Sequence, residues 1–133
     1  MGILWTVWPL DDQMRDWLDE LDVSYPDAES RFPTGSEIKG AVAALSNEYN
    51  IVYTDNGVGG PWQAAFSSMD DPERGPWALL NVQEYKGDGE INRFGFEKGW
   101  ESLNIEIVRA IAQSCGPLVL IDDAGHEPTV VAA

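Results

Sequence analysis

The first part of the chain alternates a short apolar run with a helical pattern. Ile3 to Trp8 is a β-branched and aromatic run that ends at Pro9, which is typical of a strand. From Leu10 to Asp22, apolar residues recur at steps of three and four, so this segment predicts a helix with one apolar and one acidic face. Two prolines then indicate a loop over Tyr25 to Pro33.

A second helix is expected after this loop, followed by strands. Thr34 or Ser36 caps the helix, and its apolar residues continue at helical spacing to Tyr49. The Lys86-Gly87-Asp88-Gly89 segment separates two strand-like runs and predicts a hairpin turn. Segments rich in Gly, Pro and Asp separate four strand candidates, which are Ile51–Thr54, Trp62–Ser67, Trp77–Glu84 and Ile91–Phe96.

The last part of the chain predicts a third helix and a closing hairpin. The helix runs from Trp100 or Glu101 to Ser114 and stops before Gly116-Pro117. Strands are expected at Leu118 to Ile121 and at Thr129 to Val131. The element order predicts a single α+β domain over residues 1–133, with an antiparallel-dominated sheet of about five to six strands and about three helices packed mainly on one face.

Charge narrows the possible partners. Eight Lys and Arg against 23 Asp and Glu give a net charge of −15. Such a charge repels nucleic-acid phosphates and anionic membrane surfaces, whereas it attracts cations and basic protein surfaces. We therefore expect a protein partner, with no direct nucleic-acid and no membrane binding. The alternative is that the acidity serves only solubility.

The chain has features of a cytoplasmic protein. Cys115 is its only cysteine, so no internal disulfide forms and the thiol is expected to be buried. Met1 to Leu10 has no basic residue before its short apolar run, unlike a secretory signal. No segment approaches the length that a membrane span needs. Together these features predict a cytoplasmic location.

Catalytic motifs are weak in this sequence. Asp122, Asp123 and His126 lie close together and are the best candidates for metal or acid–base chemistry. Both aspartates already have an explanation as turn residues, and a divalent metal needs more ligands than three. We therefore predict no enzyme activity, cofactor or metal. A metal-assisted hydrolase that uses these three residues stays as an alternative of another class.

Two acidic segments are candidate contact surfaces. The first helix carries most of its carboxylates on the side that faces water, and Arg15 is its only basic residue. The connection from Met69 to Arg74 lies between two predicted strands and reaches into solvent. The acidic residues expected to contact a partner are Asp12, Asp16, Asp19 and Glu20 on the helix, and Asp70, Asp71 and Glu73 on the connection.

Tryptophans supply candidate anchors. Interface cores favour Trp, and the chain has six. Trp5 and Trp17 match predicted apolar faces and are assigned to the core. Those next to Pro or Gly at element ends are expected to be partly exposed, and Trp62 and Trp77 are assigned to the binding surface; the other two of this group are Trp8 and Trp100.

Two segments are similar to stretches of small bacterial immunity proteins. They are Arg31 to Ile38, before a helix, and Gly116 to Asp123, near the end of the chain. The resemblance implies a compact acidic domain that inhibits a bacterial toxin or effector by direct binding. The alternatives are a nucleic-acid mimic of the anti-CRISPR or anti-restriction type, and a structural or adaptor domain that forms a homo-oligomer.

Overall fold

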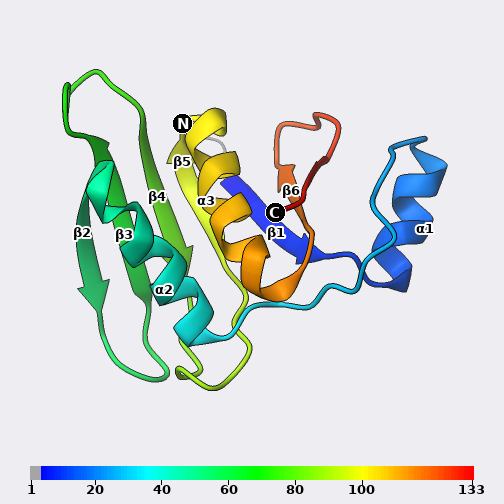
Figure 1. The fold of residues 1–133 in the computed structure, drawn as a ribbon, viewed down its shortest axis with the longest axis horizontal. Helices are drawn as coiled ribbons and strands as arrows, with labels where there is room; N and C mark the ends of the chain where they lie inside the picture. Colours follow the sequence, from blue (N-terminus) through cyan, green and yellow to red (C-terminus); the bar gives the residue numbers. More distant parts are fainter. Residues whose placement is uncertain (1–3) are drawn as a thin grey trace.

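One seven-stranded antiparallel sheet runs through the protein (Figure 1). The computed structural model describes residues 4–133. The strands are β1 (Leu4–Pro9), β2 (Tyr49–Asp55), β3 (Trp62–Ser68), β4 (Trp77–Val82), β5 (Gly95–Gly99), β6 (Leu118–Asp122) and β7 (Thr129–Val131). Their order across the sheet is β2-β3-β4-β5-β1-β6-β7. The predicted α+β class is confirmed, and the seven strands are slightly more than the five to six expected.

Helices α2 (Gly35–Ala44) and α3 (Glu101–Cys115) cover one face of the sheet (Figure 1). Alternate strand residues such as Leu80, Phe96 and Leu120 point into this layer, where they are at most 2% exposed. Helix α3 adds Ile107 and other buried apolar residues at helical spacing. This layer is the main hydrophobic core.

Helix α1 (Asp12–Glu20) packs on the opposite face, at the β6–β7 end of the sheet. A small separate cluster joins Leu18 to Leu10 and Val119. In β6, Val119 alternates with Leu118 and Leu120, which belong to the main core, so the two clusters lie on opposite faces. Two helices therefore cover one face, and the third covers a corner of the other.

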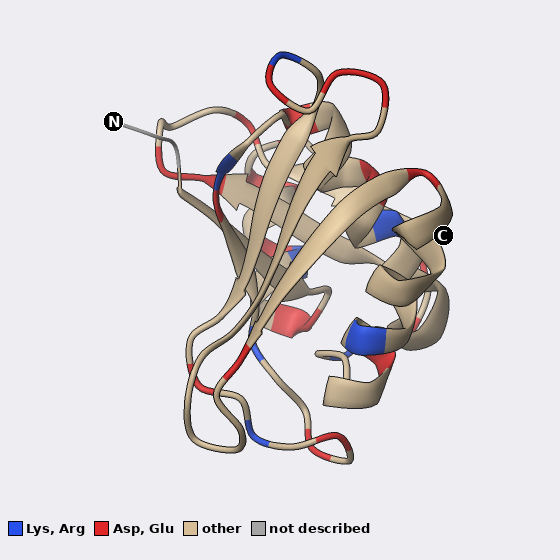
Figure 2. Ribbon diagram, turned by 90° about the vertical axis from the view of Figure 1, so that its left-hand side faces the viewer, with Lys and Arg blue, Asp and Glu red and all other residues tan. Residues whose placement is uncertain are grey.

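The rest of that second face is open. Its strand residues are mostly neutral, and the outward positions of β1 to β4 include Leu4, Thr6, Trp8, Asn50, Val52, Thr54, Gln63, Ala65, Ser67, Trp77, Leu79 and Asn81. On β5 the charged residues are Glu97 and the exposed Lys98, which lie where the β4–β5 register shifts. Figure 2 shows most of the acidic residues on loops and helices and only a few on strands. The acidic charge thus lies around the sheet and largely spares its open face.

The predicted element order is confirmed, with differences at several boundaries. The second helix ends at Ala44, a short 3-10 turn (η1, Leu45–Asn47) follows, and Tyr49 begins β2. Tyr49 was expected on the helix, because its spacing fits both periods. The predicted first strand is confirmed from Leu4 to Pro9, and its predicted first residue, Ile3, lies outside the described residues. The last strand has the predicted bounds, Thr129–Val131.

The predicted hairpin at residues 86–89 is wrong. Strand β4 ends at Val82, and β5 begins only at Gly95, so a long loop replaces the tight turn. Asn92 organises this loop: its Oδ1 accepts a hydrogen bond from the Lys86 N–H at 2.7 Å, and its Nδ2 donates to the carbonyl of Glu90 at 2.8 Å. A side chain that bonds nearby backbone in this way offers an alternative to the strand ladder.

None of the helices in the described part of the chain has both the length and the apolar character that crossing a membrane requires.

Candidate protein-binding site

Helix α1 presents four carboxylates on one side. Asp12, Asp16, Asp19 and Glu20 are all exposed. At 3.6 residues per turn they fall within about 100° of the helix circumference. They form the α1 acidic stripe, which lies at one end of the molecule in Figure 1. The sequence-predicted residues of this helix therefore do share one solvent-facing surface.

Local interactions fix the orientation of the stripe. Asp11 caps the helix, because its Oδ1 accepts a hydrogen bond from the Met14 N–H at 2.8 Å. Leu18 is fully buried and holds the opposite side of α1 against β6. The last turn contains no basic residue. Carboxylates near a helix C-terminus face its negative end, which is unfavourable, so a nearby cation would stabilise this end of α1.

The one cation of the helix does not neutralise the stripe. The guanidinium Nη2 of Arg15 donates to the carbonyl oxygen of Ala28 at 2.8 Å and is partly buried. Among the described residues, none of the four stripe carboxylates forms a salt bridge. The stripe therefore keeps its full negative charge toward solvent.

Two apolar side chains flank the stripe. Trp17 is 37% exposed and Leu21 is 42% exposed. Trp17 was predicted to lie in the core, and that prediction is wrong, because α1 buries only the side that carries Leu18. Exposed Trp is enriched at the centre of protein interfaces, and polar or charged residues surround it at the rim. No separate signal for this was present in the sequence, because Trp17 lies only about 60° from Met14 around the helix and so belongs to the same apolar pattern.

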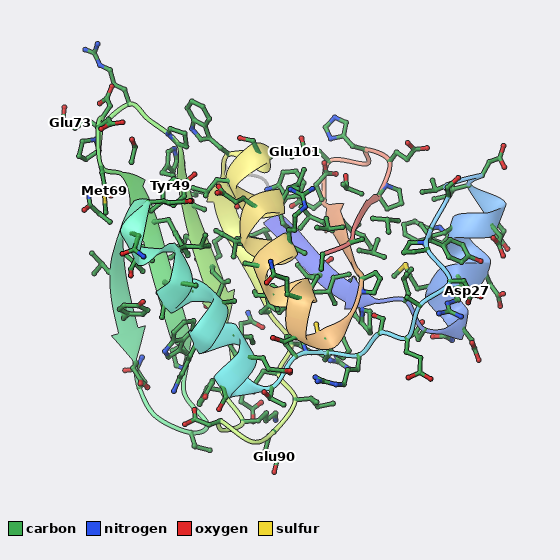
Figure 3. All side chains as sticks on the ribbon, viewed as in Figure 1. Asp27, Tyr49, Met69, Glu73, Glu90 and Glu101 are labelled. Carbon is green, nitrogen blue, oxygen red and sulfur yellow. The ribbon has the colours of Figure 1, made fainter. Side chains whose placement is uncertain are left out.

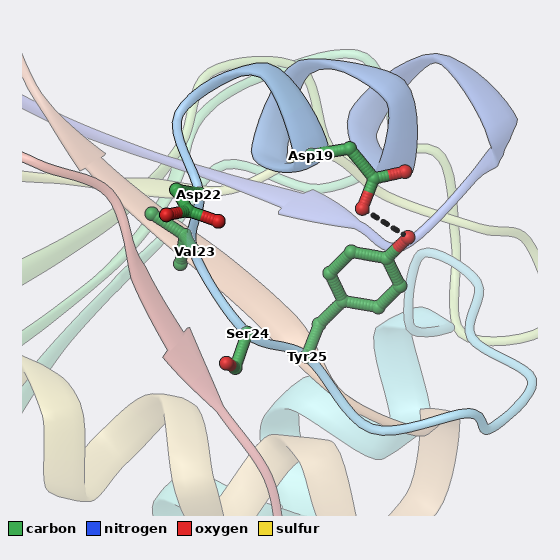
Figure 4. A pocket seen from close by; sticks show the side chains of 5 residues that line it. All are labelled: Asp19, Asp22, Val23, Ser24 and Tyr25. Carbon is green, nitrogen blue, oxygen red and sulfur yellow. Dashed lines mark hydrogen bonds between the residues drawn. The ribbon is translucent and has the colours of Figure 1, made fainter.

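A shallow hollow of about 300 Å³ adjoins the C-terminal end of α1 (Figure 4). Its lining residues are Asp19, Asp22, Val23, Ser24 and Tyr25. The Tyr25 hydroxyl donates to Oδ1 of Asp19 at 2.9 Å. This bond and the negative charge of Asp19 raise the pKa of Tyr25. The Tyr25 hydroxyl thus stays protonated and bonded to Asp19, and the carboxylates of Asp19 and Asp22 are the acceptors that a basic side chain of a partner would meet.

The second predicted surface is the β3–β4 loop. Asp70, Asp71 and Glu73 are exposed there, and Trp77 is 40% exposed where β4 begins. Oδ1 of Asp71 accepts from the Arg74 N–H at 3.0 Å, so this carboxylate also shapes the turn.

Trp62 does not belong to this surface. It is only 3% exposed, because the alternation of β3 turns it toward the helices α2 and α3 rather than toward solvent. Its indole ring packs near Tyr53, with 5.9 Å between ring centroids. The expectation that its position next to Pro61 leaves it accessible is wrong, since its place in the strand pattern decides its burial.

The structure does not bring the two predicted surfaces together. Helix α1 packs on β6 and β7, whereas the loop follows β3. Four strand spacings separate β3 from β6, about 19 Å. In Figure 3, Glu73 lies at one end of the molecule and Asp27, beside α1, lies at the other. They are two separate acidic surfaces.

A groove of about 800 Å³ crosses the open face and was not predicted from the sequence. Its aromatic end joins Trp8 and Phe32, whose ring centroids are 5.9 Å apart. The Arg93 guanidinium lies 5.7 Å from both ring centroids. The groove brings together β1, β5 and the β4–β5 loop, which are distant in sequence, so no local pattern reveals it.

Of the Asp122, Asp123 and His126 side chains, only those of Asp122 and His126 contact each other. Oδ1 of Asp122 accepts from the Ala124 and His126 N–H groups, and its Oδ2 lies 2.6 Å from Nδ1 of His126. This contact raises the pKa of His126. Oδ1 of Asp123 instead accepts from the Leu4 N–H at 3.1 Å. Across residues 4–133, no three His, Cys, Asp or Glu side chains form a group that could hold a metal ion.

No family model, curated protein or solved structure matches the chain.

Proposed function

We propose that this protein is an acidic protein-binding domain that inhibits a basic toxin or effector domain by direct binding, in the manner of an immunity protein. The observation that carries the proposal is the α1 acidic stripe, which forms no salt bridge with any residue from 4 to 133 and lies beside the exposed Trp17. A basic surface would relieve repulsion within the stripe, and the indole would supply apolar contact area. The cytoplasm is the proposed location.

The test reverses charge at two places by the same amount. Asp16→Lys with Glu20→Lys changes the stripe, and Asp70→Lys with Glu73→Lys changes the β3–β4 loop. Each pair shifts the net charge by the same +4, and within residues 4–133 none of these four carboxylates accepts a hydrogen bond, so the two proteins differ only in where the charge is lost.

The partner is isolated with the unaltered chain as bait from cells that encode it, and its association with each variant is then followed by surface plasmon resonance at several salt concentrations. We expect the α1 variant to associate roughly tenfold more slowly at low salt and with a weaker salt dependence, because steering by charge is lost. The loop variant is expected to change association much less.

Inhibition is the second readout. The chain should reduce the activity of the isolated partner in proportion to the complex formed, and the α1 variant should require more protein for the same effect. Equal association rates for both variants would remove α1 from the interface. A partner that binds but keeps its full activity would contradict the inhibitor role and leave only the binding function.

A further inference from the structure

Strand β2 is an uncovered edge of the sheet. It pairs with β3 over seven consecutive residue pairs, from Tyr49↔Ser68 to Asp55↔Trp62, with no bulge. No described strand pairs with its other side, and it lies at the left margin of the sheet in Figure 1. In an antiparallel strand every second residue directs its N–H and C=O outward, so β2 offers about three such pairs to an added strand.

The edge lacks the usual protection against strand addition. Natural edges are kept free by short length, Lys or Pro residues, or bulges. The other edge strand, β7, has only three residues and follows Pro128. Strand β2 has seven residues and contains no Lys, Arg or Pro. Its Val52 is 69% exposed and its Tyr53 is 49% exposed, so both faces offer apolar contact beside the free backbone.

Acidic side chains lie at both ends of this edge. Glu48 precedes the strand and lies near Glu106 of α3, whose Oε2 accepts a hydrogen bond from the Tyr49 hydroxyl at 2.7 Å. The closeness of the two carboxyl groups raises the pKa of Glu48. Asp55 stands at the other end of the strand, about 24 Å along the chain from Glu48. The edge is therefore apolar in its middle and negative at its ends.

We infer that β2 binds an extended basic segment of a partner protein as an eighth strand. The backbone of the segment pairs with β2, an apolar side chain lies over Val52, and cationic side chains near its two ends meet Glu48 and Asp55. Strand addition of this kind obtains affinity from the backbone and specificity from side chains at alternate positions. The inference rests on the proposed function only for the basic character of the partner, since α1 lies at the other end of the sheet.

Charge favours this occupant over a second copy of the chain. A two-fold dimer through an edge strand pairs the two β2 strands antiparallel. Full overlap then brings Glu48 of one copy toward Asp55 of the other, so like charges meet at both ends. A basic segment instead finds an opposite charge at each end.

The probe is a synthetic peptide of alternating Thr and Val with one Arg at each end, nine residues long. Hydrogen exchange of the β2 amides is measured with and without it. We expect exchange at alternate β2 amides to slow at least tenfold, with no change in β7. The same peptide with Glu in place of both Arg residues is expected to bind at least tenfold more weakly. No protection of β2, or equal binding of the Glu peptide, would overturn the inference.

Two matched variants distinguish peptide binding at the β2 edge from binding on the open face of the sheet. Val52→Lys places a cation on the edge strand, whereas Ala65→Lys places it on the same face one strand further in, because Val52 and Ala65 are register partners. Val52→Lys should weaken binding of the Arg peptide at least tenfold, and Ala65→Lys should weaken it less than threefold. Equal losses would place the peptide on the open face and refute strand addition.

Two further measurements close the test. The Asp16→Lys, Glu20→Lys protein should bind the peptide as the unaltered chain does. If this variant lost as much peptide binding as Val52→Lys, attraction by net charge alone would explain the binding, and the inference would be overturned. If it bound the peptide normally and its association with the partner was also unchanged, the result would contradict only the role of α1 in the proposed function. Sedimentation of the chain alone should give a monomer, and a dimer with protected β2 amides would make the second copy the occupant.

Discussion

Helices α1 and α3 both pack on the sheet, yet they bury their residues to very different extents. The 15 residues of α3 include seven buried ones, and its apolar side chains belong to the main core. The nine residues of α1 bury only Leu18, within a small cluster on the other face. A helix with few buried contacts opens at low cost. The comparison therefore separates a helix that holds the fold from one whose surface is available for binding.

The contrast between α1 and α3 is tested most directly by truncating one buried residue in each helix. Ile107→Ala leaves a cavity in the main core and should lower the free energy of unfolding by about 3–4 kcal/mol. Leu18→Ala should cost about 2–3 kcal/mol, but mainly as local opening of α1, with the sheet intact. Denaturant unfolding followed by tryptophan fluorescence gives the first value, and hydrogen exchange of the α1 amides gives the second.

Exposed residues serve as controls for both truncations. Ser102→Ala on α3 and Gln13→Ala on α1 change exposed positions and should shift stability by less than about 0.5 kcal/mol. If Leu18→Ala unfolds the whole protein in one transition together with the sheet, α1 is part of the cooperative core and the contrast between the two helices fails.

Sequence periodicity identified both helices, but it did not show that α3 is much more deeply buried than α1. The steps of four from Leu103 to Cys115 predicted the buried side of α3 correctly. In α1 the same reasoning counted Trp17 as core, although the cluster on that face holds only the side chains near Leu18. Periodicity states which residues share a side, whereas the amount of burial depends on which strands lie beneath, and that is a property of the sheet order.

The features of the candidate sites also differ in whether the sequence alone could predict them. Exposure of the α1 carboxylates follows from local helix geometry, so the sequence was sufficient for it. The burial of Trp62 follows from the alternation of β3, which outweighs the neighbouring Pro61. The free edge of β2 depends on strand order, and the groove at Arg93 depends on contacts between distant segments. No single-chain pattern contains that information.

An acid titration tests an ion pair that helps to hold α2 and α3 in place on the main core. Arg31 forms a two-pronged ion pair with Glu37 of α2, at 2.6 and 2.9 Å, and also donates to the Ser114 carbonyl of α3 at 3.3 Å. The Arg31 guanidinium, with the Thr34 N–H and hydroxyl, lowers the pKa of Glu37 from 4.5 to about 2. The carboxylate therefore stabilises the folded state fully above pH 4.5, and this stabilisation is lost as the pH falls toward 2.

The expected loss is about 1–2 kcal/mol, less than the pKa shift alone implies, because Arg31 is half exposed and solvent screens the pair. Thermal unfolding by circular dichroism between pH 7 and pH 2 measures it. Glu37→Gln should start less stable and show a flatter dependence on pH over this range. A Glu37→Gln curve parallel to that of the unaltered chain would assign the acid sensitivity to other carboxyl groups.

The smallest expected effect is confined to the end of α1. Asp22 follows the helix with φ of 60°, and the N–H groups of Asp22 and Val23 bond to the carbonyls of Asp19 and Leu18 at 3.1 and 2.9 Å. This is the left-handed helix termination in which Gly is the preferred residue. Asp22→Gly should stabilise α1 by about 1 kcal/mol, because a side chain no longer strains this conformation.

The matched control for Asp22→Gly is Asp22→Asn, which removes the same negative charge from the helix end but keeps a side chain. Hydrogen exchange of the α1 amides should slow roughly fivefold in Asp22→Gly and less in Asp22→Asn, while α3 stays unchanged in both. Equal protection in the two variants would mean that charge near the helix end, and not backbone strain, limits α1. Slower exchange in α3 as well would show that the two helices open together, which is the opposite of what their burial predicts.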